Sequence, residues 1–290
     1  MRALIMIAAS LAITGCSAEA PEKKGNSDGD RGAATTASAS ASATATAETG
    51  AAQTAASASA NGEAYAFEKK LGEPNGGEME FKYAWPAAVA AEPALVQQLG
   101  EHRDKMLKTV TQEWRDVLDD CPADAVSCRN ASYSNTYEVV ANLPRFLSLS
   151  NMLYTYTGGA HGMYGKDSSI WDRQTKELIA PDEFFTSLAA IEGAVRRKAC
   201  AALDRERLKR RGEVLQGEAG EWPNNCPGMD ETVLFVGSSN GKTFDRLGLY
   251  YGPYVAGPYA EGEFEINLPV DGAVLKAVKP EYAAYFSAKR

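Results

Sequence analysis

The sequence predicts a globular region of mixed helices and β-strands that follows an exported, low-complexity N-terminal segment. Residues 78–85 alternate apolar and polar side chains, which is the pattern of a strand with one solvated face. Residues 92–119 and 181–212 repeat apolar side chains at helical spacing. Residues 33–60 are dominated by Ala, Ser and Thr, without aromatic or large aliphatic side chains. Such a stretch buries too little apolar surface to offset the entropy of ordering.

The N-terminus has the layout of a bacterial lipoprotein signal. Residues 1–15 carry Arg2, an apolar run and then small residues, and they are too short to span a bilayer permanently. Their end, Leu11-Ala12-Ile13-Thr14-Gly15-Cys16, resembles the lipobox, whose cysteine becomes the lipid-bearing N-terminus. An ordinary signal peptide with an incidental cysteine is the alternative. Because Ser17 is not aspartate, we expect an outer-membrane lipoprotein that faces the periplasm, with the cell surface as the other orientation.

The remaining cysteines predict disulfides. If Cys16 is lipidated, four others remain, and an even number in an exported chain favours disulfides in an oxidising compartment. Of the three possible pairings, Cys121–Cys128 and Cys200–Cys226 each close a short local loop, so we predict these two. A zinc site would use closely paired ligands and a nearby histidine, which this spacing does not offer, so no metal is expected.

Residues 16–62 are expected to form a disordered linker, and the globular part begins near residue 63. In order, we expect strands at 65–67, 78–85, 133–143, 146–156, 168–173, 232–236, 243–251 and 263–268, and helices at 92–119, 181–212 and from 271. Basic residues crowd the later half of the second helix. We expect them to complement the helix dipole and mostly to face solvent, with a patch for anionic glycans or lipid headgroups as the alternative.

The strand at 146–156 runs into a glycine-dense turn at residues 158–162 that holds His161, one of two histidines in the chain. Glycines at this density are expensive in chain entropy and indicate positive φ or close approach of another group. One interpretation is a tight bend with His161 bonded to the backbone. The other is a binding or catalytic turn that displays His161.

A second unusual stretch, residues 250–262, interleaves tyrosines with Gly and Pro. Tyrosine provides contact area at low entropic cost and suits interfaces. The alternative is that the rings pack beneath the loop as core. From the two stretches we predict ligand-binding roles for Tyr156, Gly158, Gly159, His161, Tyr164, Tyr251, Tyr254 and Tyr259.

Composition and motifs point away from several function classes. The formal net charge is −8, which argues against nucleic acid and anionic membrane as partners and is compatible with a cationic protein. We therefore expect contact with the membrane only through the N-terminal lipid. The chain has no nucleophile elbow, phosphate-binding glycine loop or paired zinc histidines, so no cofactor is expected and a non-enzymatic role is favoured.

Residues Tyr156-Thr157-Gly158-Gly159-Ala160-His161 resemble the Tyr-x-Gly-Gly-Ala-His signature of the RsiV/PdaC-type envelope domain family. The turn and Asp-x-Phe segment at 172–185 and the tyrosine segment at 251–262 are similar to later motifs of that family. The resemblance covers about residues 65–275. It implies an α+β fold of two packed lobes, each an antiparallel sheet with a long amphipathic helix. The expected division is a PdaC-like lobe at 63–165 and an RsiV-like lobe at 166–290.

The resemblance also implies an envelope location and a ligand. In the RsiV branch this region binds lysozyme and signals through a membrane helix, which is not expected here. In the PdaC branch the deacetylase chemistry resides in a separate metal-binding module, so that activity is not carried over. We expect a non-catalytic binding module for a cationic lysozyme-like protein or peptidoglycan. The alternative is a hydrolase of cell-wall glycan with His161 as general acid–base.

Overall fold

The computed structural model describes residues 55–56, 63–74, 76–122, 124–212 and 221–289. The predicted signal peptide, Cys16 and nearly all of the predicted linker lie outside the described residues. The described elements form two sheets, each with a long helix, so the predicted α+β class is confirmed. No helix among these residues has the length and apolar character needed to cross a membrane.

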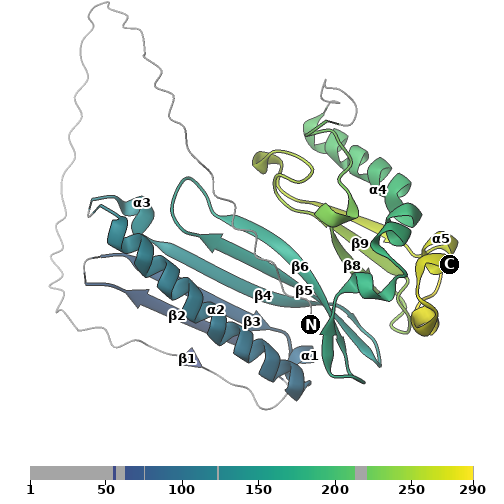
Figure 1. Ribbon diagram of the computed structural model, residues 1–290, viewed down its shortest axis with the longest axis horizontal. Coiled ribbons are helices and arrows are strands. Elements are labelled where there is room, and N and C mark those ends of the chain that lie inside the picture. Colours follow the sequence, from purple (N-terminus) through teal and green to yellow (C-terminus); the bar gives the residue numbers. More distant parts are fainter. Residues whose placement is uncertain (1–54, 57–62, 75, 123, 213–220, 290) are drawn as a thin grey trace, which may run out of the picture. The chain divides into compact units, whose positions relative to one another are not determined.

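The larger sheet has seven strands in sequential order (Figure 1). They are β1 (Ala55–Ala56), β2 (Tyr65–Gly72), β3 (Glu78–Trp85), β4 (Ala131–Asn142), β5 (Phe146–Tyr156), β6 (Met163–Asp172) and β7 (Glu177–Ile179). One pair departs from the antiparallel prediction, because β3 and β4 run parallel. The chain between them passes through α2 (Pro93–Asp120), and a parallel pair requires a long crossover of this kind.

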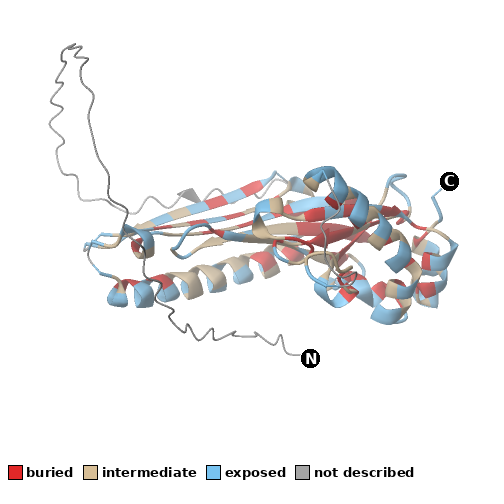
Figure 2. Cartoon of the chain, turned by 90° about the horizontal axis from the view of Figure 1, so that it is seen from above, coloured by how far each residue is buried: buried red, intermediate tan, exposed pale blue. Residues whose placement is uncertain are grey.

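Helix α2 packs against one face of this sheet. Its buried side chains are Leu95, Leu99, Trp114 and Leu118. Opposite them, β3 buries every second residue, namely Met79, Phe81, Tyr83 and Trp85, as the alternation in the sequence predicts. Figure 2 shows this alternation as bands of buried and exposed residues along the strands. Two short helices, α1 (Ala87–Ala90) and α3 (Val126–Arg129), flank α2.

The smaller sheet is antiparallel, in the order β10 (Phe264–Pro269), β9 (Arg246–Tyr251) and β8 (Val233–Gly237). Helix α4 (Leu188–Arg211) packs against it. Short helices complete this lobe: η1 (Pro181–Phe184), η2 (Met229–Glu231), η3 (Tyr259–Glu261), α5 (Gly272–Ala277) and η4 (Pro280–Tyr285).

The predicted helix at 181–212 is divided in two. The 3₁₀ turn η1 ends at Phe184, and α4 begins only after Ser187, whose side chain accepts a hydrogen bond from the Ala190 amide as an N-cap. At the other end, Gly212 with φ 74° ends the helix as predicted. The buried stripe therefore starts at Ile191 and continues with Val195, Ala199, Leu203 and Arg207, whereas Leu188 is exposed.

Two hydrophobic cores meet at the larger sheet. Strand β5 contributes Leu147 and Leu149 to the core beneath α2, and Phe146 to the core of the C-terminal lobe. Alternate residues of a strand point to opposite faces, so one strand serves both cores. Strand β6 pairs with β5 from Met163 onward, so the sheet continues through residue 165, and the predicted lobe boundary stays a prediction.

Candidate functional site

The glycine-dense turn connects β5 to β6 and uses its glycines for two separate reasons. Gly158 and Gly159 have φ values of +105° and +91°, a region that L-residues rarely adopt. A Cβ on Gly158 would also lie 2.6 Å from the carbonyl oxygen of Ser127, whereas one on Gly159 would meet nothing within 4 Å. Positive φ and close approach, the two uses expected from the sequence, are both present.

Two tyrosines, Tyr154 and Tyr156, contact this turn and stabilise its conformation. The Tyr156 hydroxyl donates a hydrogen bond to the Gly159 carbonyl oxygen at 3.1 Å. Gly162 is buried, and a Cβ there would lie 2.5 Å from the ring of Tyr154. Tyr156 therefore shapes the predicted binding turn through its hydroxyl.

His161 joins the two unusual stretches of the sequence. Its ring stacks on Tyr259, with ring centroids 3.9 Å apart and planes inclined by 19°. The Tyr259 hydroxyl donates to the Gly162 carbonyl oxygen at 2.8 Å, and that oxygen lies 3.0 Å from His161 Nδ1. The sequence predicted both stretches as candidate sites without predicting that they touch.

The tyrosine loop continues this surface. Tyr254, with φ +69° and a side chain that is 48% exposed, has its ring 5.6 Å from that of Tyr259. Trp222 is 55% exposed, and its Nε1 donates to the Tyr254 carbonyl oxygen at 3.1 Å. We call His161, Trp222, Tyr254 and Tyr259 the aromatic surface.

Trp222 is the member that the sequence reasoning missed. It lies between α4 and η2, in the segment that carries Cys226. A tryptophan four residues before a disulfide cysteine, in an otherwise polar loop, is the signal that was available. Its hydrogen bond to the tyrosine loop depends on tertiary structure and has no counterpart in sequence spacing.

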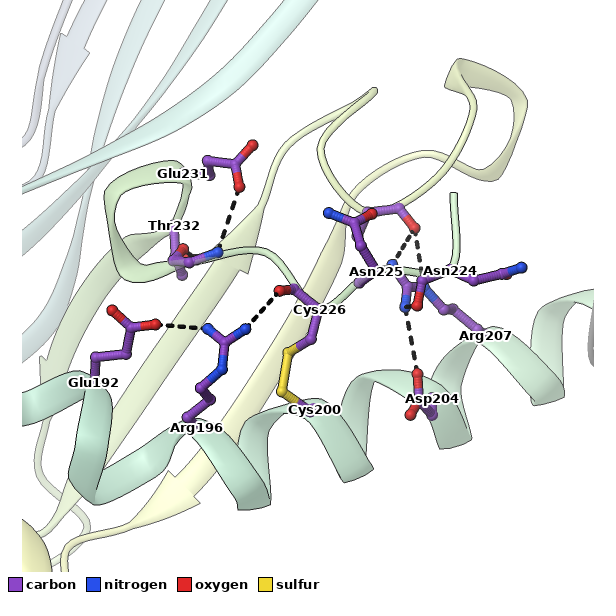
Figure 3. Close-up of a disulfide and its surroundings, with 12 residues drawn as sticks. Glu192, Arg196, Cys200, Asp204, Arg207, Asn224, Asn225, Cys226, Glu231 and Thr232 are labelled. Atoms are coloured by element: carbon purple, nitrogen blue, oxygen red, sulfur yellow. Dashed lines mark hydrogen bonds and ion pairs between the residues drawn. A yellow bond between two sulfur atoms is a disulfide. The ribbon is translucent and has the colours of Figure 1, made fainter. Parts of the chain in front are cut away.

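Two disulfides brace the chain as predicted, Cys121–Cys128 and Cys200–Cys226. The second attaches the Trp222 loop to α4 (Figure 3). Beside it, Arg196 lies between the Glu192 carboxylate at 2.6 Å and the Cys226 carbonyl oxygen at 3.3 Å. The loop that carries Trp222 is therefore held by a covalent bond and a charge-assisted bridge to the same helix.

Arg207 forms hydrogen bonds with the tyrosine loop and with the Trp222 loop. It is 4% exposed, and it donates to the Ala256 carbonyl oxygen in the tyrosine loop and to the carbonyl oxygens of Asn224 and Asn225. Burial lowers the pKa of its guanidinium. Figure 3 shows the side chain directed from α4 toward the Asn224–Asn225 segment.

Most basic residues of α4 are exposed, as the sequence predicts, but Arg207 and Arg211 point inward. Arg207 is buried, and Arg211 forms a two-pronged ion pair with Glu261, with both nitrogen–oxygen distances 2.8 Å. The two arginines are four residues apart, so they lie on one face of the helix. The periodicity of the apolar stripe, extended by one more turn, would have placed Arg207 inward.

Two predicted tyrosines do not belong to the exposed surface. Tyr251 is 2% exposed and packs in the C-terminal core, so it is not available to a ligand. Tyr164 is partly buried, and its hydroxyl donates to Glu263 at 2.6 Å. The carboxylate raises the pKa of Tyr164 to about 12, and the same bond lowers the pKa of Glu263. Tyr164 thus ties β6 to the segment before β10.

Among the described residues, the contacts of His161 do not include the side-chain partners that acid–base catalysis would use. Its hydrogen-bonding contact is with a backbone oxygen and its ring contact is with Tyr259. Within the described ranges, no hydrogen bond joins it to a serine, aspartate or glutamate side chain, and no group of three or more His, Cys, Asp or Glu is arranged to hold a metal ion. The hydrolase alternative therefore stays a prediction, and the described residues offer no catalytic partner side chain for His161.

Comparisons with known proteins agree with the resemblance seen in the sequence. Residues 75–164 match the family of the deacetylase PdaC. This segment runs from just before β3 to the first residues of β6 and contains the motif that carries the resemblance. The chain is therefore similar to the PdaC family over this segment, and the RsiV/PdaC-type resemblance is confirmed.

Two solved structures are similar to this chain. One is a DUF3298 family protein from Pseudomonas aeruginosa PAO1, with 18% identity, 78% of this chain and 96% of that chain covered, and a TM-score of 0.49. The other is a DUF3298 family member from Bacteroides fragilis NCTC 9343, with 17% identity, 76% and 91% covered, and a TM-score of 0.43. No curated protein matches the chain.

Proposed function

We propose that this chain is a lipid-anchored binding module of the bacterial envelope that recognises a partner through its aromatic surface. The observation that carries the proposal is the stack of His161 on Tyr259, because it joins the glycine turn to the tyrosine loop, and His161 and Tyr254 beside this contact are exposed. The lipobox-like signal supports an outer-membrane lipoprotein anchored through Cys16 and facing the periplasm.

The favoured partner is a cationic protein of the lysozyme type. Exposed Trp and Tyr side chains are typical anchors of protein interfaces, and an acidic chain attracts a basic partner over long range. The net charge of −8 and the exposure of Trp222 and Tyr254 both fit this partner. Peptidoglycan is the second candidate, because sugar rings also stack on flat aromatic side chains.

The loops that carry the aromatic surface are held in place before any ligand binds. Arg207, the Cys200–Cys226 disulfide and the Arg211–Glu261 pair hold the two loops in place, so little ordering entropy remains to be lost when a ligand binds. A binding role therefore accounts for both the exposed rings and the buried supports beneath them.

The test is a binding measurement on the exported chain with Cys16→Ala, which removes the lipid anchor. We expect retention of a c-type lysozyme on the immobilised protein, weakened by about tenfold or more in Trp222→Ala and Tyr254→Ala, the range of interface hot spots. Leu178→Ala, which removes an exposed apolar side chain on β7, is the control and should leave binding unchanged.

The salt dependence of binding distinguishes the two candidate partners. Binding of a cationic protein should weaken as NaCl is raised, because exposed charges are screened. Binding of purified peptidoglycan by ring stacking should change little. If neither lysozyme nor peptidoglycan is retained, or if the two aromatic variants bind as the parent does, the proposed function is wrong.

A further inference from the structure

A second site lies between α2 and the larger sheet. A cavity of about 250 Å³ opens there. Met106, Val110 and Trp114 line it from α2, and Met79, Tyr133 and Leu153 line it from the sheet. Between the buried residues Leu99 and Trp114, the residues that α2 turns toward this space are only partly buried.

The size and lining of this cavity suit a small apolar group. An engineered apolar cavity of about 150 Å³ in another protein stays dry and binds benzene, so the present volume is sufficient for a ring or a short aliphatic chain. Val117 and Leu153 at its edge are 40% and 36% exposed, so the cavity is open to solvent. Leaving such a surface in water is unfavourable, and an apolar ligand would cover it.

The mouth of the cavity has a definite polarity. Among the described residues that line it, the one charged side chain is Glu113, and the other polar groups include the hydroxyls of Thr155 and Thr157. A carboxylate and hydroxyls favour a head group that is cationic or uncharged and donates hydrogen bonds. They disfavour an anionic head group such as that of a fatty acid.

We propose that this cavity is a binding site for an amphiphile with one short aliphatic or aryl group and an uncharged or cationic head. The apolar group lies between Val110 and Leu153, and the head group lies at the mouth beside Glu113. The cavity is distinct from the aromatic surface, because none of His161, Trp222, Tyr254 and Tyr259 lines it, although Tyr156 and Thr157 at the start of the glycine turn do.

The test is a calorimetric titration of the full exported chain with Cys16→Ala, using hexan-1-ol as the probe. We expect a dissociation constant in the millimolar range or tighter, given the few methylene groups that would be buried. Val110→Phe fills the cavity and should weaken binding by about tenfold or more. Val139→Phe, the same substitution at an exposed position on β4, is the matched control and should bind as the parent does.

Charge selectivity provides the second measurement. Hexylammonium should bind at least as well as hexan-1-ol, and hexanoate about threefold more weakly, which is the range of an exposed charge pair. Glu113→Gln should remove the difference between hexylammonium and hexanoate. This variant does not alter the apolar wall, so it remains informative if Val110→Phe proves unstable.

Two results would overturn the proposal. One is the absence of binding of hexan-1-ol and hexylammonium to the parent chain. The other is binding that Val110→Phe, shown by circular dichroism to be folded, leaves unchanged. Concentration-dependent dimerisation that is abolished by Val110→Phe, without binding of either probe, would assign the cavity to a second copy of the chain instead. None of these outcomes bears on lysozyme or peptidoglycan binding.

Discussion

Arg207 on α4 grips the carbonyl oxygen of Ala256 with two nitrogens, Nε at 3.0 Å and Nη2 at 2.8 Å. The contact joins residues that lie 49 positions apart in the sequence. It fixes the tyrosine loop to the helix, and the remaining donors of the same guanidinium hold the Trp222 loop. A single buried cation therefore determines the spacing between two segments of the aromatic surface.

Replacing this guanidinium should be costly. Arg207→Lys keeps the positive charge but loses the planar fork, and it leaves buried carbonyl oxygens without donors. We expect the free energy of unfolding to fall by about 2–3 kcal/mol, measured by urea denaturation. Arg197→Lys, on the exposed side of the same helix, is the control and should change stability by less than about 0.5 kcal/mol. Equal effects of the two substitutions would contradict the structural role of Arg207.

The two glycines of the turn should respond differently to alanine. Gly159→Ala should cost about 1 kcal/mol, from left-handed backbone strain alone. Gly158→Ala should cost about 1–3 kcal/mol more, because its Cβ would press on the Ser127 carbonyl and force the backbone to shift. Parallel urea denaturation of both variants measures the difference. If Gly159→Ala lowered the free energy of unfolding more than Gly158→Ala does, the described packing of Gly158 against Ser127 of α3 would be contradicted.

The loss of stability on removing each disulfide should increase with the length of the loop that it closes. Cys200 and Cys226 are 26 residues apart, and Cys121 and Cys128 are 7 apart. Chain entropy predicts losses of about 3.5 and about 2.5 kcal/mol for the corresponding double alanine variants. Thermal unfolding of both variants gives the comparison. The loss of Cys200–Cys226 should also weaken partner binding, since it releases the Trp222 loop, whereas the loss of Cys121–Cys128 should not.

Stability should fall between neutral and mildly acidic pH because of His102. Its Nδ1 lies 2.8 Å from the Tyr83 hydroxyl, and burial, with Lys105 nearby, lowers its pKa from 6.5. The unfolded chain therefore binds a proton at a higher pH than the folded chain. The stabilisation is complete above pH 6.5 and declines as the pH falls from there toward the lowered value.

The measurement for His102 is the free energy of unfolding at pH 7.5 and at pH 5.5. The parent should lose stability between these two values, and His102→Gln should lose less, because the amide does not titrate. A parent and variant with the same pH dependence would contradict this assignment. Comparison at two pH values cancels the cost of the substitution itself.

Much of the fold could be predicted because it depends on local patterns. The period-two alternation in β3 and the N-cap position of Asp271 before α5 both follow from side chains that are close in sequence. The loop before β9 was harder. The sequence predicts a strand from residue 243, but Asp245 is buried and accepts hydrogen bonds from Ser239 and Asn240, so β9 starts only at Arg246.

The site was only partly predictable, for a physical reason. Glycine density marks unusual backbone, so Gly158 and Gly159 could be selected from sequence alone. The pairing of His161 with Tyr259 joins residues nearly one hundred positions apart, and no local spacing encodes it. The burial of Tyr251 beside the exposure of Tyr254 depends on where β9 ends, which composition does not determine.

The parallel pairing of β3 with β4 has a consequence for the order in which the chain folds. Strands β4, β5 and β6 are consecutive hairpins, whose ends need to close only short loops. Strand β3 can join them only when the long segment that contains α2 closes between β3 and β4, which is a long-range and therefore slow event. Pulse-labelling of amide hydrogens during refolding should accordingly protect β5 before β3, and simultaneous protection would indicate a different folding nucleus.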